Sequence, residues 1–367
     1  MNRALIFICF LISTMYCMAQ EGTGDSTTVD TIVVAGGGAD TVVAAYEKID
    51  QEAEELYNRG ISKFQKGATQ AAISDFTEAI AIKPTFTKAY YNRGSAKHVL
   101  KDYKGAIADF DKAIANDPLS AAAHFSRGQS NYALGKKRDA LLDYNHCLSN
   151  DMTNAKAYYY RGGIKFELED YKGAKMDFSL VIKNDSKNAN AYNDRASSKK
   201  KLGDDEGAKK DYAKAVQLNP KFAIAYNNLG SVKKKLGDYK GAVLEYSLAI
   251  KIKPDYYIAL NNRGSAKFEL EDYKGAIADF TASIKIKTDY AYAYNNRAAT
   301  KCKLEDYNGV IKDCNVAIKL NAKYGYAYLN RGIAKEMLRD PEGACADWTK
   351  AEEYGIKTAK SYLQDCN

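Results

Sequence analysis

Histidine, the residue type most often used for acid–base and metal chemistry near neutral pH, occurs only three times in this 367-residue chain. The three histidines, His98, His124 and His146, fall at unrelated places in the 34-residue period described below, so we expect that they do not converge. His146 and Cys147 are adjacent, and on a helix their side chains would point about 100° apart. No two cysteines have the Cys-x-x-Cys spacing of a metal site. We therefore expect no enzyme activity, no bound metal and no cofactor.

Arginine and aspartate recur together at a fixed separation. In eight places an arginine is followed sixteen residues later by an aspartate, as in Arg93 and Asp109 or in Arg263 and Asp279. A ninth place has Leu229 instead of arginine, and there a glutamate replaces the aspartate. Because the two positions change together, we interpret them as structural ion pairs that join two helices, rather than as a ligand site.

These arginines belong to a repeat of 34 residues that runs through most of the chain without an insertion or deletion. A small residue follows the arginine position in all nine repeats: Gly60, Gly94, Gly128, Gly162, Ala196, Gly230, Gly264, Ala298 and Gly332. A second small residue comes twelve residues later, and an aromatic residue or its substitute follows after four more. Four of the five prolines lie 24 residues after the first small residue. Chance does not keep such a register, so the repeat is the unit of the fold.

Each repeat is predicted to form two helices joined by a turn. In the second repeat Tyr90 and Gly94 are four residues apart, so they share one face of the first helix. Asp102 then stands at the N-terminus of the second helix, where it can accept a hydrogen bond from a free backbone amide. The second helix buries small residues and Phe110, and it ends before Pro118, which cannot continue a helix.

The order of small, small, aromatic, small and proline residues at this period resembles the tetratricopeptide repeat. The resemblance implies an all-α fold, a right-handed superhelical solenoid of nine 34-residue helix–turn–helix repeats whose first helices line a concave groove. We expect the nine repeats to begin at residue 53 within a solenoid of residues 46–355, and residues 356–367 to form a C-terminal capping helix. Tyrosine often stands where the family has tryptophan, and the proline column is lost at Met152, Ser186, Thr288 and Ala322.

The face of the first helices opposite the buried one carries an asparagine in six repeats: Asn58, Asn92, Asn228, Asn262, Asn296 and Asn330. Similar proteins use such a ladder to hold the backbone of an extended peptide, because an amide side chain offers donors and an acceptor. The alternative is that asparagine is only a tolerated polar residue there. In the last four repeats the lysine positions of a carboxylate clamp hold Ile224, Ile258, Tyr292 and Tyr326. An apolar groove with amide groups is therefore predicted in the C-terminal half.

Two consecutive repeats each carry three lysines at the same place, Lys199–Lys201 and Lys233–Lys235. The spacing directs two of each three toward the groove, and we select Lys200, Lys201, Lys234 and Lys235 as a candidate anion patch. Such a patch could attract an acidic peptide, an anionic glycan or a phosphate-bearing polymer. Lysines that are simply solvated on a long helix are the alternative. No nucleic acid is expected as a partner, because no known nucleic-acid module is present.

Residues 1–19 have the order of a secretory signal peptide: a basic residue, an apolar run and a small residue, Ala19, at the expected cleavage point. The apolar run is shorter than a membrane-spanning helix, and no second candidate span follows it. Lipidation of Cys17 is an alternative to cleavage after Ala19. Residues 20–45 are rich in glycine, threonine and aspartate and are predicted to be a flexible linker. We expect an exported bacterial protein of the periplasm, cell envelope or medium.

Signal cleavage would leave five cysteines, an odd number that cannot pair completely within one chain: Cys147, Cys302, Cys314, Cys345 and Cys366. Most are predicted to be small buried residues, and the sequence leaves open whether any of them pair. Hydrophobic residues at 46% and charged residues at 27% exclude an intrinsically disordered chain. The sequence therefore predicts a non-enzymatic scaffold or adaptor that binds a protein or an extended peptide in its groove. An envelope protein that binds an anionic polymer through the lysines is the alternative.

Overall fold

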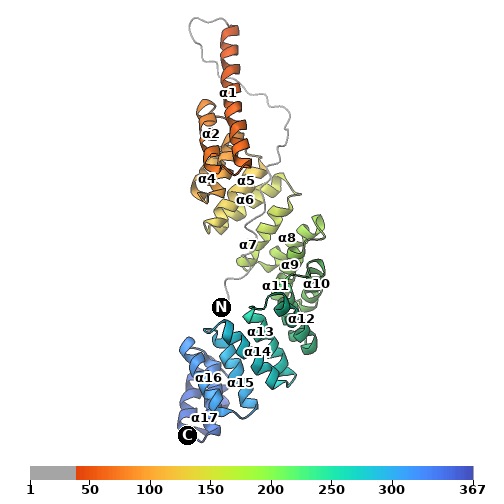
Figure 1. Ribbon diagram of the computed structural model, residues 1–367, viewed down its shortest axis with the longest axis vertical. Coiled ribbons are helices and arrows are strands. Elements are labelled where there is room, and N and C mark those ends of the chain that lie inside the picture. The colour runs from red at the N-terminus through yellow and green to blue at the C-terminus, as the bar shows by residue number, and fades with distance from the viewer. Residues whose placement is uncertain (1–38, 367) are drawn as a thin grey trace. The chain divides into compact units, whose positions relative to one another are not determined.

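The computed structural model describes residues 39–366, and in that range every regular element is a helix (Figure 1). The chain divides into a unit of residues 1–52 and a unit of residues 53–367. The helices are α1 (Ala39–Gln65), α2 (Thr69–Ile82), α3 (Thr87–Val99), α4 (Tyr103–Asn116), α5 (Ala121–Ala133), α6 (Lys137–Asn150), α7 (Ala155–Glu167), α8 (Tyr171–Asn184), α9 (Ala189–Lys201), α10 (Asp205–Leu218), α11 (Ala223–Lys235), α12 (Tyr239–Ile252), α13 (Tyr257–Glu269), α14 (Tyr273–Ile286), α15 (Ala291–Lys303), α16 (Tyr307–Leu320), α17 (Gly325–Met337), α18 (Pro341–Glu353) and α19 (Ala359–Tyr362). No helix among these residues is both long and apolar enough to span a bilayer.

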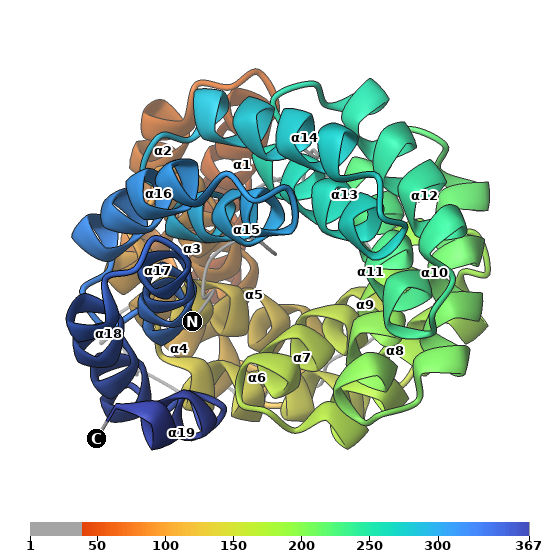
Figure 2. The same ribbon diagram turned by 90° about the horizontal axis from the view of Figure 1, so that it is seen from below.

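Consecutive helices pack in pairs, and each pair packs against the next, within residues 53–367. From α3 to α17 every first helix has 13 residues, and from α2 to α16 every second helix has 14. Figure 2 shows the first helices α7 to α15 on the inner side of this unit and the second helices α8 to α14 on its outer side. The fold is therefore a solenoid stabilised by contacts between neighbouring repeats, and the predicted fold class is confirmed.

The turns follow from residues at the helix ends. Asp102 accepts a hydrogen bond from the Gly105 amide at 3.0 Å and so caps α4, as the sequence predicted. Equivalent aspartates cap six later second helices: Asp170, Asp204, Asp238, Asp272, Asp306 and Asp340. The residue just before the cap has a left-handed backbone conformation with positive φ. It is a glycine in some repeats and Lys101 (φ 64°) in the second repeat.

The small and aromatic columns meet where the two helices of a repeat cross. A Cβ atom added at Gly94 would lie only 2.9 Å from the Phe110 ring, so glycine allows the aromatic side chain to pack against the helix backbone. Phe110 is fully buried. In the eighth repeat the first small residue is Ala298, and the position of the aromatic residue holds Cys314, which is also fully buried. Each repeat therefore buries a small group of side chains at this crossing, and the core consists of several such clusters along the solenoid.

Two predicted boundaries need correction. Helix α1 begins at Ala39, so the predicted linker of residues 20–45 overlaps a helix at its C-terminal end. The sequence after Gly38 contains no further glycine or proline until Gly60, and nothing therefore interrupts the helix there. The signal peptide of residues 1–19 and the linker up to residue 38 lie outside the described residues.

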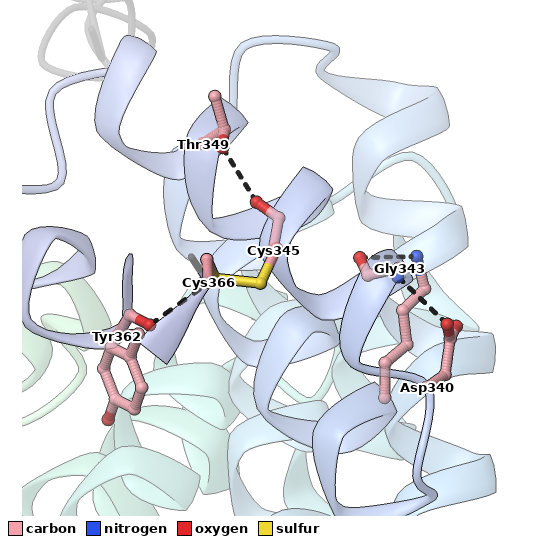
Figure 3. Close-up of a disulfide and its surroundings, with 7 residues drawn as sticks. Asp340, Gly343, Cys345, Thr349, Tyr362 and Cys366 are labelled. Carbon is pink, nitrogen blue, oxygen red and sulfur yellow. Dashed lines mark hydrogen bonds between the residues drawn. A yellow bond between two sulfur atoms is a disulfide. The ribbon is translucent and has the colours of Figure 1, made fainter. Parts of the chain in front are cut away.

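The C-terminal cap is shorter than the helix predicted over residues 356–367. After α18 the chain turns at Gly355 (φ +87°), and α19 begins only at Ala359, followed by a 3₁₀ turn at Leu363–Asp365. Ala359 is fully buried, and the Tyr362 ring lies 5.0 Å from that of Trp348 on α18. A disulfide between Cys345 on α18 and Cys366 fastens this segment to the last repeat (Figure 3).

Candidate functional site

The structure places each of the eight arginines against its aspartate on the facing helix. Arg93 on α3 donates to Asp109 on α4 through Nε (2.9 Å) and Nη2 (2.7 Å), and Asp109 is 3% exposed. Arg263 and Asp279 make the same two-bonded contact at 2.8 and 2.6 Å. The other six pairs have nitrogen–oxygen distances of 2.5–2.8 Å: Arg59–Asp75, Arg127–Asp143, Arg161–Asp177, Arg195–Asp211, Arg297–Asp313 and Arg331–Asp347. These pairs join the two helices within a repeat.

A lysine one helical turn after the arginine completes the contact, and the sequence analysis missed it. Lys97 Nζ lies 2.7 Å from Asp109 Oδ2, so the carboxylate holds two cations in an ion triad. Six other aspartates meet a lysine in the same way, the lysines being Lys63, Lys165, Lys199, Lys267, Lys301 and Lys335. The signal was present in the sequence, because lysine recurs four residues after the arginine and therefore on the same helix face.

The repeat that lacks the arginine keeps the lysine contact. Lys233 Nζ lies 2.6 Å from Glu245 Oε1, where glutamate replaces the usual aspartate opposite Leu229. The longer acidic side chain therefore pairs with the single remaining cation. Lys199 and Lys233 thus belong to structural pairs, and this separates them from the other lysines of the two predicted lysine runs.

The predicted asparagine column forms hydrogen bonds between repeats. The Nδ2 group of each outer asparagine donates to the Oδ1 atom of an asparagine 35 residues earlier, at 3.0–3.1 Å: Asn228 to Asn193, Asn262 to Asn227, Asn296 to Asn261, and Asn330 to Asn295. The same register holds in earlier repeats, where Asn92 donates to Tyr57 and Tyr159 donates to Asp194. Asn58 in the first repeat is exposed. These contacts, which we call the amide ladder, fasten successive first helices together.

The buried half of the amide ladder was not predicted. Its members each stand one position before the predicted column, and all four are buried: Asn193, Asn227, Asn261 and Asn295. An amide side chain carries two donor hydrogens and two acceptor lone pairs, and the bond between repeats uses one donor hydrogen of each outer asparagine. The outer asparagines are half-buried, so they remain at the surface of the first helices with further hydrogen-bonding capacity.

The outer asparagines share a helix face with residues four positions before and seven positions after them. On α11 this face consists of Ile224, Asn228 and Lys235, and corresponding residues continue it on neighbouring first helices. We call it the groove face. Ile224, Tyr292 and Tyr326 are 38%, 46% and 55% exposed along it. The groove face of the C-terminal repeats thus presents apolar side chains beside amide groups.

The four lysines selected from the sequence lie together at the C-terminal ends of α9 and α11, and we call them the lysine cluster. Lys235 Nζ pairs with Asp205 Oδ2 at 2.6 Å, and Lys234 Nζ donates to Ser265 Oγ at 2.9 Å. Lys201 Nζ lies 5.7 Å from the centre of the Tyr171 ring. Burial lowers the pKa of Lys200, and the neighbouring ammonium groups of the cluster lower it further.

Two of the histidines come together, contrary to the expectation from their repeat phases. The rings of His124 and His146 stack with their centres 5.0 Å apart, and His124 Nδ1 lies 3.8 Å from Asp143 Oδ1. In this repeat Asn131 replaces the lysine of the ion triad and donates to Asp143 at 2.9 Å. The sequence analysis missed this pairing because His124 lies early in α5 and His146 lies late in α6. The positions of the two residues within the repeat do not show that they meet. Within the described residues, no three His, Cys, Asp or Glu side chains form a group that could hold a metal ion.

Among residues 39–366, three cysteines remain as thiols, Cys147 and Cys314 buried and Cys302 half-buried. Burial raises the pKa of the Cys147 and Cys314 thiols to about 12. Both therefore stay protonated at neutral pH, which makes them poor nucleophiles.

Equal-length helix pairs that stack in one register define a helical-repeat solenoid. Family models described as tetratricopeptide repeat match residues 87–118, 223–256 and 257–290, and one described as TPR repeat matches residues 196–237. The chain therefore contains tetratricopeptide repeats, as the resemblance implied. A comparison with curated proteins by sequence gives no match.

Solved structures with the same fold share little sequence with this chain. The Cut9–Hcn1 hetero-tetramer structure of the APC/C is 15% identical with a TM-score of 0.54, over 86% of this chain and 76% of that one. A tetratricopeptide repeat protein from Parabacteroides merdae is 19% identical with a TM-score of 0.50, over 68% and 99%. Pseudomonas aeruginosa pilF is 18% identical with a TM-score of 0.50, over 58% and 97%. These similarities support the fold, and a tetratricopeptide fold is consistent with protein–protein interaction.

Proposed function

We propose that this protein is a non-enzymatic interaction scaffold that binds an extended peptide of a partner along the groove face of its C-terminal repeats. The observation that carries the proposal is the alignment of four outer asparagines, Asn228 to Asn330, at successive repeats beside exposed apolar side chains. Amide groups can bind the backbone of any peptide, and the apolar side chains can accept its alternate residues.

The amide ladder supports this proposal in a specific way. Because each outer asparagine is fixed by its bond to the preceding repeat, its remaining donor and acceptor positions are already oriented before a ligand arrives. Binding then costs less side-chain entropy than it would for freely rotating amides. The regular step between repeats suits a ligand that is itself extended and periodic.

We further propose that the protein works outside the cytoplasm. The sequence of residues 1–19 supports export, and the disulfide between Cys345 and Cys366 fits an oxidising compartment.

The test uses a peptide selected by the full chain from a random library of twelve-residue peptides. Changing Asn262 and Asn296 together to alanine should weaken its binding by at least about 1 kcal/mol, because a hydrogen bond contributes roughly 0.5–1.5 kcal/mol. These substitutions also break two ladder bonds, so a stability-matched control is needed. Changing the buried partners Asn227 and Asn261 to alanine removes the same two bonds from the other side.

Both double variants should lose similar stability in urea denaturation. The Asn262/Asn296 variant should lose more affinity for the peptide, because the control loses only the orientation of the outer amides and keeps the amides themselves. Equal affinities in the two variants would contradict the proposal, because the outer amides would then have no contact with the peptide. Crosslinking in the native compartment, followed by identification of the captured protein, would name the partner.

A further inference from the structure

The lysine cluster and the amide ladder occupy the same face of the first helices. Lys201 follows Asp194 by seven residues on α9, and Lys235 follows Asn228 by seven on α11. Seven residues make nearly two helical turns, so each lysine stands about 20° from the ladder residue on its own helix. A ligand that lies along the ladder would therefore also pass the lysines.

The cluster has more positive than negative charge. Its four ammonium groups, those of Lys200, Lys201, Lys234 and Lys235, have the carboxylates of Asp205 and Glu269 as acidic neighbours. Lys201 and Lys235 are exposed, while Lys200 and Lys234 are half-buried. Half-buried ammonium groups are stabilised by an anion more strongly than solvated ones, because less water competes for them.

A carboxylate flanks the lysine cluster on each side along the groove face. The position of Lys201 and Lys235 is occupied by Glu167 in the preceding repeat and by Glu269 in the following one. Glu167 is itself engaged, since it accepts a hydrogen bond from Tyr132 at 2.7 Å and pairs with Lys137 at 2.8 Å. A long polyanion laid along the groove would leave the lysines and meet these carboxylates. A short acidic segment would contact the lysines alone.

We propose that the lysine cluster binds a short acidic segment, about two to four carboxylates long, within the peptide that lies along the groove face. This inference rests on the proposed function and names the chemistry of the partner. The acidic segment lies over α9 and α11, and the apolar part of the same peptide continues over α13, α15 and α17.

The probe is a labelled twelve-residue synthetic peptide with four central glutamates and a C-terminal Ile and Tyr, compared with the same peptide carrying glutamines. Fluorescence anisotropy with the full chain at low salt should show the glutamate peptide binding at least about fivefold more tightly. Changing Lys201 and Lys235 to glutamine should reduce this preference, because it removes two of the four ammonium groups and leaves only Lys200 and Lys234 to contact the carboxylates. Added salt should reduce the preference as well.

A matched control changes Lys172 and Lys240 to glutamine, since both are exposed lysines on second helices, α8 of the fourth repeat and α12 of the sixth. This control should retain the preference within twofold, and melting curves should show both double variants folded. A fivefold preference that survives in the Lys201/Lys235 variant would overturn the proposal.

Two further arms separate this inference from the proposed function. If the Asn262/Asn296 variant binds the probe more weakly than the Asn227/Asn261 control while the Lys201/Lys235 variant does not, the groove stands and the lysine assignment fails. Inorganic polyphosphate tests the polymer alternative. If polyphosphate of about fifty units binds more than tenfold more tightly than the glutamate peptide and is insensitive to the asparagine substitutions, an anionic polymer is the ligand and the acidic-peptide proposal is overturned.

Discussion

At the scale of single residues, the ion triads explain why aspartates can be buried in every repeat but the one that has glutamate. A carboxylate taken out of water is costly unless charged partners compensate it, and here an arginine and usually a lysine do so. The chain also contains its own variant of the arrangement, in which Leu229 and Glu245 replace the arginine and the aspartate and Lys233 supplies the only cation of the contact.

This natural variant provides a control for a stability test. Changing Asp279 to alanine leaves Arg263 and Lys267 without their shared carboxylate and should lower the free energy of unfolding by about 2–4 kcal/mol. Changing Arg263 to leucine together with Asp279 to glutamate copies the sixth repeat and should cost less than about 1 kcal/mol. Urea denaturation measures both, and equal losses would show that the triad has no role in stability.

A second prediction concerns Asp194, which occupies the ladder column in the fifth repeat and accepts hydrogen bonds from Tyr159 and Asn193. Burial raises its pKa to about 6. A raised carboxyl pKa means that the folded state binds the proton more tightly, so stability falls as the pH rises from about 4 to 6 and stays lower above that range. Changing Asp194 to asparagine should stabilise the protein by about 1–3 kcal/mol at pH 7.5 and by nothing near pH 3.5. A gain that is the same at both pH values would contradict this account.

At the scale of helices, the contacts divide into two sets with different roles. The ion triads and the packing of small against aromatic residues hold two helices together within a repeat. The amide ladder holds successive first helices together, and the Nη1 group of arginines such as Arg263 donates to the second helix of the preceding repeat. The last repeat has no following partner, and the segment from Gly355 to Cys366 covers it instead, fastened by the disulfide.

The cap can be tested with the single tryptophan of the chain, Trp348, whose ring lies 5.0 Å from that of Tyr362. Changing Cys366 to serine removes a crosslink that closes a loop of about twenty residues, which is typically worth around 3 kcal/mol. We expect the cap to loosen, with a changed Trp348 emission and faster trypsin cleavage near Lys357 and Lys360, while the earlier repeats keep their helicity. The wild-type protein under reducing conditions should show the same changes as the Cys366→Ser variant. Unchanged emission and cleavage would show that the disulfide does not hold the cap in place.

The helices and the arginine–aspartate contacts could be predicted because the 34-residue period relates residues of one repeat to each other. The ladder bonds could not, because they join residues 35 positions apart, such as Asn227 and Asn262. That offset of one arises from how successive helices rotate as they stack, which sequence columns do not display. The cap was predicted with the wrong length for a related reason, since residues 356–367 occur once and no copies exist to average over.

At the scale of the whole molecule, residues 1–19 are predicted to be an export signal, and the described part of the chain carries one disulfide and three thiols. If the signal is cleaved after Ala19, the mass of the mature protein corresponds to a chain that begins at Gln20. Intact-mass measurement of protein recovered from the exporting cell checks this, with a cytoplasmically expressed chain as the comparison. A mass that includes Met1 would contradict the proposed compartment, and a lipid adduct on Cys17 would replace cleavage after Ala19.

The amide ladder also gives the solenoid a mechanical property. Tension applied to the two ends would act first on the contacts between repeats, where the ladder bond and a bond from the arginine Nη1 group to the preceding second helix supplement the packing. It would act only later on the contacts inside a repeat, where two or more charged bonds hold a buried carboxylate. The chain should therefore lengthen like a spring whose coils separate while each coil keeps its form. A partner that binds several repeats at once would make the solenoid stiffer. Pulling on the chain would then release that partner from one repeat at a time.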